Sequence, residues 1–416
     1  MTKIILILFF LSASIVDIHS QNLPTQLTIE QALDVALKNN AGIKASRYDV
    51  ETSKALKKTY SEVGKTSVMG MFGQYNSAAK DANITITQSI PFPTVFTSGA
   101  ALGKATIARS EVRVTAVENE LAFQVKSVYY QLIYLKTLQT WIMRQDSVYA
   151  GFERAAGVRY RTGETSLIEK TTAETQARNI KALLMQNTAD IRIYQTRLQT
   201  LLNEDATVDV STNNLVALEL PGYDTSSLSH NPLLNFYRQQ VIVAEKQRTL
   251  SKNHILPDLT IGYFNQSLVG TPVQLNSTEL ATTSTRFQGF LAGISIPLWI
   301  GPNIAKAKVA SAQQQVAESE FELQQKTMQG QWEEALQDIQ KYQDMIAYYQ
   351  DASLPNADLL ITQSQRAYQG GEIGYLEYLQ GLRTATEIRT GYINAINNYN
   401  QAVIRLEYLI GNSKTN

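Results

Sequence analysis

Two short stretches place a phenol and two carboxylates at identical spacing, and they have the most potential for chemistry. The first stretch contains Tyr160, Gly163, Glu164 and Glu169. The second contains Tyr368, Gly371, Glu372 and Glu377, each 208 residues after its counterpart. Carboxylates and phenols can attract cations and form hydrogen bonds. No histidine or cysteine stands beside them to complete a nucleophile–base pair or a metal site.

Composition excludes several classes of function. The 416-residue chain contains no cysteine, so it has no disulfide, thiolate zinc site or cysteine nucleophile. Its three histidines, His19, His230 and His254, are far apart in the sequence. Lysine plus arginine equals aspartate plus glutamate at 37 each, so no basic surface for nucleic acid is indicated. We therefore expect no enzyme activity, no cofactor, no metal site and no nucleic-acid partner.

The elements around each stretch predict a tight turn between two long helices. Each glycine can end a helix, and each following glutamate falls where the dipole of the next helix favours negative charge. Residues 98–160 contain no proline and repeat apolar residues at alternating spacings of four and three. About sixty helical residues span on the order of 90 Å. The sequence therefore predicts a long antiparallel coiled-coil hairpin over 98–202.

The chain then repeats this plan, which indicates an internal duplication. Seven heptad positions of the returning helix recur 208 residues later: Ile180, Leu184, Asn187, Ile191, Tyr194, Leu198 and Leu201 correspond to Ile388, Tyr392, Ala395, Tyr399, Ala402, Leu406 and Leu409. We predict a first repeat over 21–203, a linker over 204–227, and a second repeat over 228–411. The second hairpin is expected over 304–410, and Pro355 predicts a kink or a break in its first leg.

Each repeat also predicts two β-strands ahead of its hairpin. The expected strands cover 65–76 and 83–92 in the first repeat, and 258–267 and 287–298 in the second. In 83–92, isoleucines alternate with threonine and serine, which is typical of a sheet with one apolar and one polar face. About ten residues is the length that a tilted transmembrane strand needs. The fold class is thus mainly α with β.

The beginning of the chain predicts export from the cytoplasm. Lys3 precedes a short apolar run, and small or polar residues follow to Ser20. We expect a signal peptide over 1–20, because the apolar run is too short to span a membrane as an anchor. No later stretch reaches the length of about 18–20 apolar residues that a membrane helix needs.

The strand count predicts more than one copy of the chain. Four membrane-length strands cannot close, and lipid does not tolerate open sheet edges. Two copies would give eight strands, which fill their own barrel, and three would give twelve and leave a lumen. Long helices behind the barrel favour a conduit, and therefore a homotrimer.

With these features in place, the sequence resembles the TolC-type outer-membrane efflux proteins. The opening segment 27–40 (LTIEQALDVALKNN) is similar to the entry helix of that family. Asn231-Pro232 resembles the start of its second repeat, and the two Tyr-x-x-Gly-Glu turns resemble its periplasmic tips. Ala41 departs from the proline usual in the first repeat. The resemblance covers essentially the whole mature chain.

This resemblance implies a homotrimer in the outer membrane of a Gram-negative bacterium. The family combines a twelve-stranded β-barrel, in contact with outer-membrane lipid, with an α-helical tunnel across the periplasm. It works with a periplasmic adaptor and an inner-membrane pump of the RND or ABC type, in efflux or type I secretion. The short chain with compact loops is more similar to the heavy-metal branch than to the drug branch. The residues leave the exported substrate open among metal ions, drugs and protein.

By the same resemblance, the two turns form the tip that meets the adaptor and narrows the tunnel. Glu169 and Glu377 would form acidic rings in a trimer, favouring cations and raising the pKa values of the crowded carboxylates. Tyr160 and Tyr368 would hold the closed tip, and Glu164 and Glu372 would contact the adaptor. Simpler readings stay open: Glu164 and Glu372 as first-turn helix residues, Glu169 and Glu377 as solvated helix charges, and the tyrosines as coiled-coil packing.

Two other functions also fit part of the sequence. A passive porin would use the strands but has no need of long duplicated helices. A soluble periplasmic coiled-coil adaptor or scaffold would use the helices, and a soluble sheet can show the same alternation. Met69 and Met71 alternate on one strand and suggest either soft-metal handling or barrel filling, of which filling is the more common use.

Overall fold

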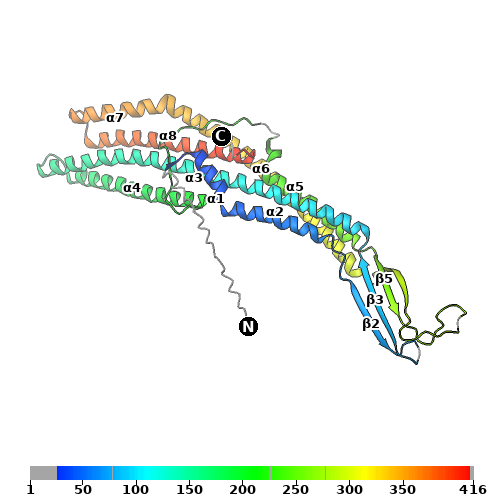
Figure 1. Cartoon of the computed structure of the whole chain (residues 1–416). Coiled ribbons are helices and arrows are strands. Elements are labelled where there is room, and N and C mark those ends of the chain that lie inside the picture. The colour runs from blue at the N-terminus through cyan, green and yellow to red at the C-terminus, as the bar shows by residue number, and fades with distance from the viewer. Residues whose placement is uncertain (1–25, 77, 224–226, 277, 413–416) are drawn as a thin grey trace, which may run out of the picture.

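The protein is elongated, with a β-sheet at one end and two helical turns at the other (Figure 1). This computed structural model describes residues 26–76, 78–223, 227–276 and 278–412. The signal peptide expected over 1–20 lies outside the described residues. The described chain is mainly helical with some strands, which confirms the predicted fold class.

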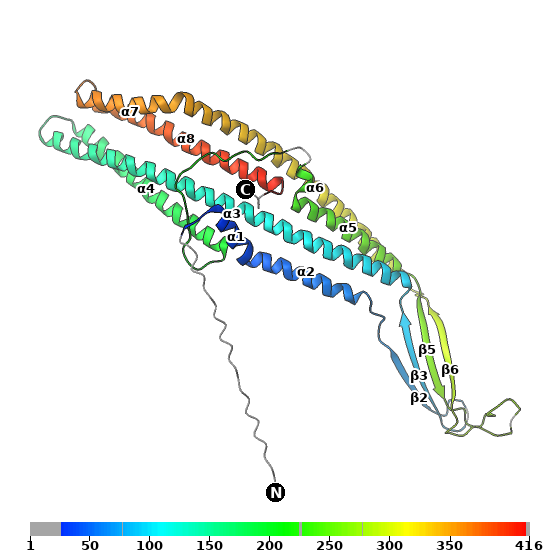
Figure 2. The same cartoon turned by 45° about the horizontal axis from the view of Figure 1, so that its top comes forward.

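The first repeat contains a single long helix that runs from the sheet to the far end of the molecule. Its helices are α1 (Ile29–Asn39), α2 (Ala41–Thr59), α3 (Pro93–Arg161) and α4 (Leu167–Leu202). The 69 residues of α3 correspond to about 100 Å. Both α2 and α4 lie along α3, one toward the sheet and one toward the turn (Figure 2).

The second repeat has the same order, but its long leg is broken. Its helices are α5 (Pro232–Asn253), α6 (Gly301–Tyr348), α7 (Leu354–Gln369) and α8 (Tyr375–Leu409), after a short 3-10 turn at Ser227–His230. A π-helical turn, Tyr349–Ser353, separates α6 from α7. Pro355 follows it and removes one backbone donor from the helix. The predicted break at this proline is confirmed.

No helix within the described ranges has both the length and the apolar character needed to cross a membrane.

The four longer strands form one antiparallel sheet whose two outer strands come from different repeats. The strands are β2 (Ser67–Gly73), β3 (Asp81–Ile90), β5 (Asp258–Gln266) and β6 (Phe287–Ser295), in the order β2-β3-β5-β6. Within the described chain, β2 and β6 each have one unpaired edge. The strand β2 is shorter than the expected 65–76 because Gly73 takes a φ of 137° and ends it.

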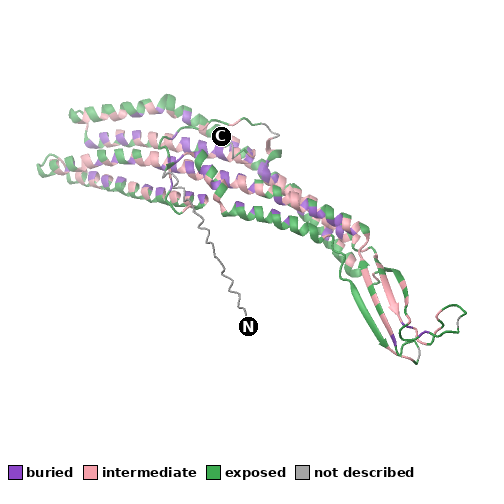
Figure 3. Ribbon diagram, viewed as in Figure 1, coloured by how far each residue is buried: buried purple, intermediate pink, exposed green. Residues whose placement is uncertain are grey.

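The register of the sheet separates an apolar face from a more polar one. Val68, Ile86, Tyr263 and Phe290 lie opposite one another across the four strands and therefore share a face. The neighbouring row on the other face is Met69, Thr85, Phe264 and Gly289. Three residues of the apolar row, Val68, Ile86 and Phe290, are exposed, with Phe290 at 88%, and Tyr263 is half-buried (Figure 3). Met69 and Met71 thus lie on the more polar face.

Two asparagines join the end of one helix to the start of another. Asn231 accepts hydrogen bonds from the first amides of α5 at Leu233 and Leu234, and its Nδ2 donates to the last carbonyls of α8 at Tyr408 and Leu409. Asn40 does the same between α4 and α2, accepting from Gly42 and donating to the Leu201 carbonyl. Each side chain therefore satisfies unpaired groups of two helix ends.

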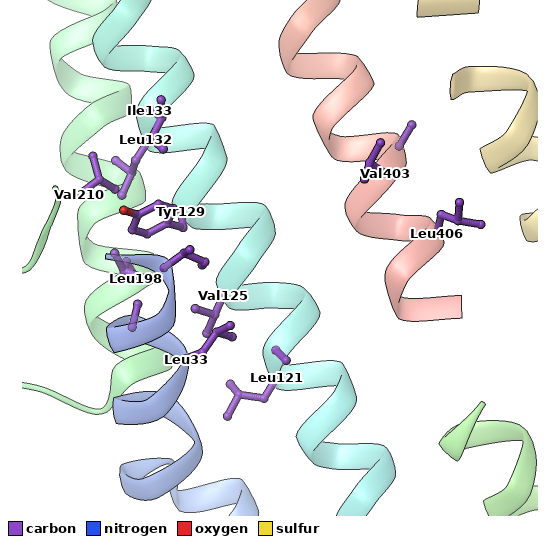
Figure 4. Close-up of a cluster of buried hydrophobic side chains, with 14 of the residues drawn as sticks. Leu33, Leu121, Val125, Tyr129, Leu132, Ile133, Leu198, Val210, Val403 and Leu406 are labelled. Atoms are coloured by element: carbon purple, nitrogen blue, oxygen red, sulfur yellow. The ribbon is translucent and has the colours of Figure 1, made fainter. Parts of the chain in front are cut away.

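The main hydrophobic core lies midway along the helices, where α1, α3, α4 and α8 meet (Figure 4). The predicted heptad residues Leu121, Val125, Leu132 and Leu198 are buried there. The linker predicted over 204–227 contains a short strand. Its strand β4 (Asp209–Val210) pairs in parallel with β1 (Gln26–Leu27), and Val210 is buried in the same core.

Candidate functional site

Both predicted turns lie at the same end of the molecule and share one backbone conformation (Figures 1 and 2). Gly163 and Gly371 have φ values of 80° and 77°, in the left-handed region that glycine adopts without strain. The amide of Glu164 donates to the Arg159 carbonyl at 2.8 Å, and that of Glu372 donates to the Ala367 carbonyl at 2.8 Å. These bonds close the preceding helix, so Tyr-x-x-Gly-Glu is a helix-ending motif in both repeats.

The later glutamates both occupy the third position of the helix that follows the turn. The amide of Gly374 donates to Oε2 of Glu377 at 2.9 Å, and Glu377 is otherwise exposed. The amide of Glu169 donates to the Ser166 hydroxyl at 3.2 Å, and its carboxylate accepts from the Thr165 hydroxyl. Each carboxylate is therefore fixed at a helix N-terminus, where the helix dipole favours negative charge.

Arg159 connects the carboxylates of the first turn to the second repeat, and sequence reasoning missed it. Its guanidinium lies 3.7 Å from Oε1 of Glu169 and 3.9 Å from Oε2 of Glu164. It also donates to the phenol oxygen of Tyr368 at 3.1 Å. The equivalent position of the second repeat is Ala367, so this arginine has no duplicate. One signal for this residue was available in the sequence: the first repeat has a charged side chain where the second has alanine.

Aromatic rings pack the two tips together beside this arginine. Tyr368 stacks on Tyr378 with ring centres 5.2 Å apart, and Phe152 of α3 lies 4.8 Å from Tyr378 and 6.0 Å from Tyr375. The Tyr375 hydroxyl is buried without a hydrogen-bond partner. Burial raises the pKa of Tyr375 above its ordinary value, and the negative charge of Glu169 adds to the effect. This phenol therefore stays neutral at physiological pH.

The two equivalent tyrosines occupy different surroundings. Tyr368 is half-buried among the rings, whereas Tyr160 is 39% exposed, with the Lys170 ammonium 5.3 Å from its ring centre. The structure thus brings Glu164, Glu169 and Tyr368 together around Arg159. It leaves Tyr160, Glu372 and Glu377 on the surface of the tip.

Exposed apolar side chains follow each turn, and these were also missed. Ile168 is 76% exposed and Leu376, exactly one repeat length later, is 68% exposed. Leu167, the residue before Ile168, is exposed as well. Each occupies the first turn of a helix, where no neighbouring helix covers it within the described chain. Among the described residues, no group of three or more histidine, cysteine, aspartate or glutamate side chains is placed to hold a metal ion.

Solved outer-membrane channels share this fold over nearly the whole chain. The Campylobacter jejuni channel CmeC matches with a TM-score of 0.77 at 14% identity, over 92% of this chain and 86% of its own. The Vibrio cholerae outer membrane protein VceC matches with a TM-score of 0.75 at 15% identity, over 92% and 96%. The open state of the Neisseria gonorrhoeae channel MtrE matches with a TM-score of 0.73 at 15% identity, over 92% and 89%. At these identities the likeness is one of fold.

Sequence comparison places the second repeat in one family. Residues 225–412 match the profile of the family described as outer membrane efflux protein, whose range begins near the start of α5 and ends just after α8. No curated protein sequence matches the chain. The profile match of the second repeat and the shared fold of both repeats lead to one conclusion: residues 225–412 are similar in sequence to the outer membrane efflux proteins, and both repeats share the fold of solved outer-membrane channels.

Proposed function

We propose that this protein is the outer-membrane exit duct of a tripartite efflux system. One observation carries the proposal: an apolar-faced sheet with two unpaired edges stands at one end of helices about 100 Å long. The sheet suits a membrane, and the helices suit a passage across the periplasm. The match of residues 225–412 to the outer membrane efflux protein profile supports the same function.

The unpaired edges of the sheet support a homotrimer. The outer strands β2 and β6 run antiparallel to each other, so β6 of one copy can continue the antiparallel order with β2 of the next. Three copies give twelve strands, with the row of Val68, Ile86, Tyr263 and Phe290 facing lipid and the row with Thr85 facing the lumen. The hairpins of the three copies would then line one α-helical tunnel.

The tips form the closed end of this duct. Arg159 holds the first turn against Tyr368 of the second, and the aromatic rings beside it fill the space between the hairpins. Opening requires these contacts to separate. Glu377, exposed after the second turn of each copy, would form a ring of three carboxylates that favours cations, whereas Arg159 lies 3.7 Å from the Glu169 carboxylate and offsets part of its charge. The exposed Ile168 and Leu376 suit contact with the α-hairpin of a periplasmic adaptor.

The remaining partners follow from the duct function. A periplasmic adaptor would connect the tips to an inner-membrane pump of the RND or ABC type, and the outer-membrane lipid would surround the strands. The notion of a heavy-metal cargo gains no support from the described residues, because they contain no clustered metal ligands along the duct. A cation cargo remains compatible with the exposed Glu377.

The proposal is tested by locating the protein, counting its copies and measuring its conductance. Membrane fractionation should place it in the outer membrane, and native mass spectrometry in detergent should show a heat-labile trimer. In planar bilayers the trimer should conduct weakly, because the tips are closed, and conduct more when Arg159 is replaced. A soluble monomer would contradict the duct and favour the periplasmic scaffold. High conductance that is insensitive to Arg159 would favour a passive porin.

A further inference from the structure

A polar cavity lies where the first hairpin, the second hairpin and the linker meet. Its volume is about 260 Å³, and its walls come from α3, α8 and the linker residue Asn213. Trp141 and Arg144 of α3 face the cavity on one side, and Arg389 and Tyr392 of α8 line it on the other. It is well away from the tips described above, since it lies about two to three helical turns before Phe152.

Two donor atoms of the residues lining this cavity lack hydrogen-bond acceptors. Trp141 Nε1 and Arg389 Nε are both shielded from solvent and have no hydrogen-bond partner. Tyr392 accepts from Gln350 Nε2 at 3.0 Å, which leaves its own proton to donate. Arg144 is exposed to solvent at the edge of the cavity, and none of the ion pairs among the described residues involves it. Buried donors without acceptors are destabilising by about 1–3 kcal/mol each, so an acceptor in the cavity would be favourable.

The acceptors around the same cavity are neutral. No carboxylate lines it. Asp358 pairs with the outer nitrogen of Arg389 and offsets part of its charge, so Arg144 supplies the net positive charge. The hydroxyls of Thr137 and Thr140 donate to carbonyls of their own helix at 2.9 and 3.0 Å. The Arg389 guanidinium is held 5.4 Å over the Trp141 ring, which fixes its position.

We propose that this cavity binds a carboxylate, bridged between Arg144 of the first repeat and Arg389 of the second. A carboxylate has two planar oxygens that match a guanidinium and can accept from the Tyr392 phenol as well. The carboxylate belongs either to a small free acid or to an acidic side chain of a protein partner. Because its partners lie on α3 and α8, the bound group ties the two hairpins together midway between core and tip.

The binding is tested on the full-length protein in detergent, labelled with 5-fluorotryptophan. The chain has three tryptophans, and the ¹⁹F signal lost in Trp141→Phe identifies the one in the cavity. Titration with glutarate should move that signal saturably while the other two stay in place. Arg144→Gln should weaken the apparent affinity about tenfold, because it removes one charged hydrogen-bonding partner and leaves the Asp358 pair intact. Arg383→Gln, on the same helix but outside the cavity, is the matched control and should bind normally.

Sodium chloride at equal ionic strength provides the comparison for non-specific screening. An equal shift with chloride, or an unchanged affinity in Arg144→Gln, would overturn the proposal. A hexaglutamate peptide separates the two sources. A tighter response to the peptide than to glutarate assigns the site to a partner's acidic side chain, and the reverse assigns it to a free acid. The readout is binding at Trp141, so it is independent of whether the protein conducts.

Discussion

Arg159 donates to the phenol oxygen of Tyr368 at 3.1 Å and thereby joins the end of α3 to the end of α7. The arginine belongs to the first repeat and the tyrosine to the second. Its guanidinium is also shared with Glu164 and Glu169, which hold it in place. The two turns of a duplicated architecture are therefore joined by a contact that is not itself duplicated.

Replacement of Arg159 by alanine is expected to open the tip. The change removes a hydrogen bond and two ion pairs that are partly exposed, together worth about 1–2 kcal/mol, or roughly a tenfold shift toward the open state. Single-channel conductance in planar bilayers is the measurement. Tyr368→Phe, which keeps the ring stack and loses only the hydroxyl, should give a smaller increase. Arg161→Ala, on the exposed last turn of α3, should behave like the unmodified protein.

Charge selectivity is expected to depend more on Glu377 than on Glu169. Glu377 is exposed, whereas Arg159 lies 3.7 Å from the Glu169 carboxylate and offsets its charge. Glu377→Gln should therefore reduce the preference for potassium over chloride, measured as a reversal potential across a salt gradient, more than Glu169→Gln does. Equal effects of the two substitutions, or none from either, would count against an acidic ring at the second turn.

Tyr375→Phe is expected to stabilise the protein. The Tyr375 hydroxyl is buried without a partner, so its removal relieves an unsatisfied group by about 1 kcal/mol and keeps the ring contacts. Burial raises the pKa of Tyr375 in the folded state, with a further contribution from Glu169. Below the ordinary tyrosine pKa of about 10 this phenol is neutral in both the folded and the unfolded state, and above it the unfolded state ionises first, so the stability of the folded protein falls as the pH rises.

Thermal unfolding followed by circular dichroism tests both parts of that prediction. Tyr375→Phe should melt at a higher temperature at pH 7, and its melting temperature should fall less between pH 9 and pH 11. Tyr375→Ala, which removes the ring, should melt lower than the unmodified protein. A lower melting temperature for Tyr375→Phe would show that the hydroxyl has a partner in the assembled protein.

Gly391→Ala is expected to destabilise the protein where α8 packs against the π-helical turn of the second hairpin. A Cβ at this position would lie 2.3 Å from the Tyr349 hydroxyl and 2.8 Å from its ring carbon, so the tyrosine must move. Overpacking of this kind is destabilising by about 1–3 kcal/mol. Gly330→Ala in α6 meets no atoms within 4 Å and should instead stabilise its helix by about 0.5–1 kcal/mol. Relative to the unmodified protein, the melting temperature should fall for Gly391→Ala and rise for Gly330→Ala.

Much of the fold could be predicted because its main determinants repeat along the chain. The heptad spacing of residues such as Leu132 and Leu198 predicts a buried helical seam, and both are buried. Alternation in the strand around Ile86 predicts two faces, and the register provides them. The pairing of β4 with β1 could not be predicted, because a two-residue strand has no period to detect. The burial of Val210 could not be predicted either, because it depends on contacts with helices that are distant in the sequence.

The site was only partly predictable for a related reason. Comparison of the repeats identifies Gly163 and Gly371, because both turns need a residue that adopts a positive φ. The same comparison does not identify Arg159, because the equivalent position of the second repeat is Ala367. It also treats Tyr160 and Tyr368 as equivalent, although only Tyr368 has a ring stack and a cationic donor. The roles assigned to the tyrosines and glutamates of the two turns in tip closure, selectivity and adaptor contact all stay predictions: Tyr160, Glu164, Glu169, Tyr368, Glu372 and Glu377.

The π-helical turn at Tyr349–Ser353 makes the two hairpins unequal in bending stiffness. In α3 an unbroken ladder of hydrogen bonds resists bending along its 69 residues. In the second repeat the ladder changes register before Pro355, so bending concentrates there and α7 can tilt as a short rigid segment. In a ring of three copies, stiff and compliant hairpins alternate around the axis. A lateral force at the tips would therefore displace every second hairpin while the others keep the diameter of the tunnel.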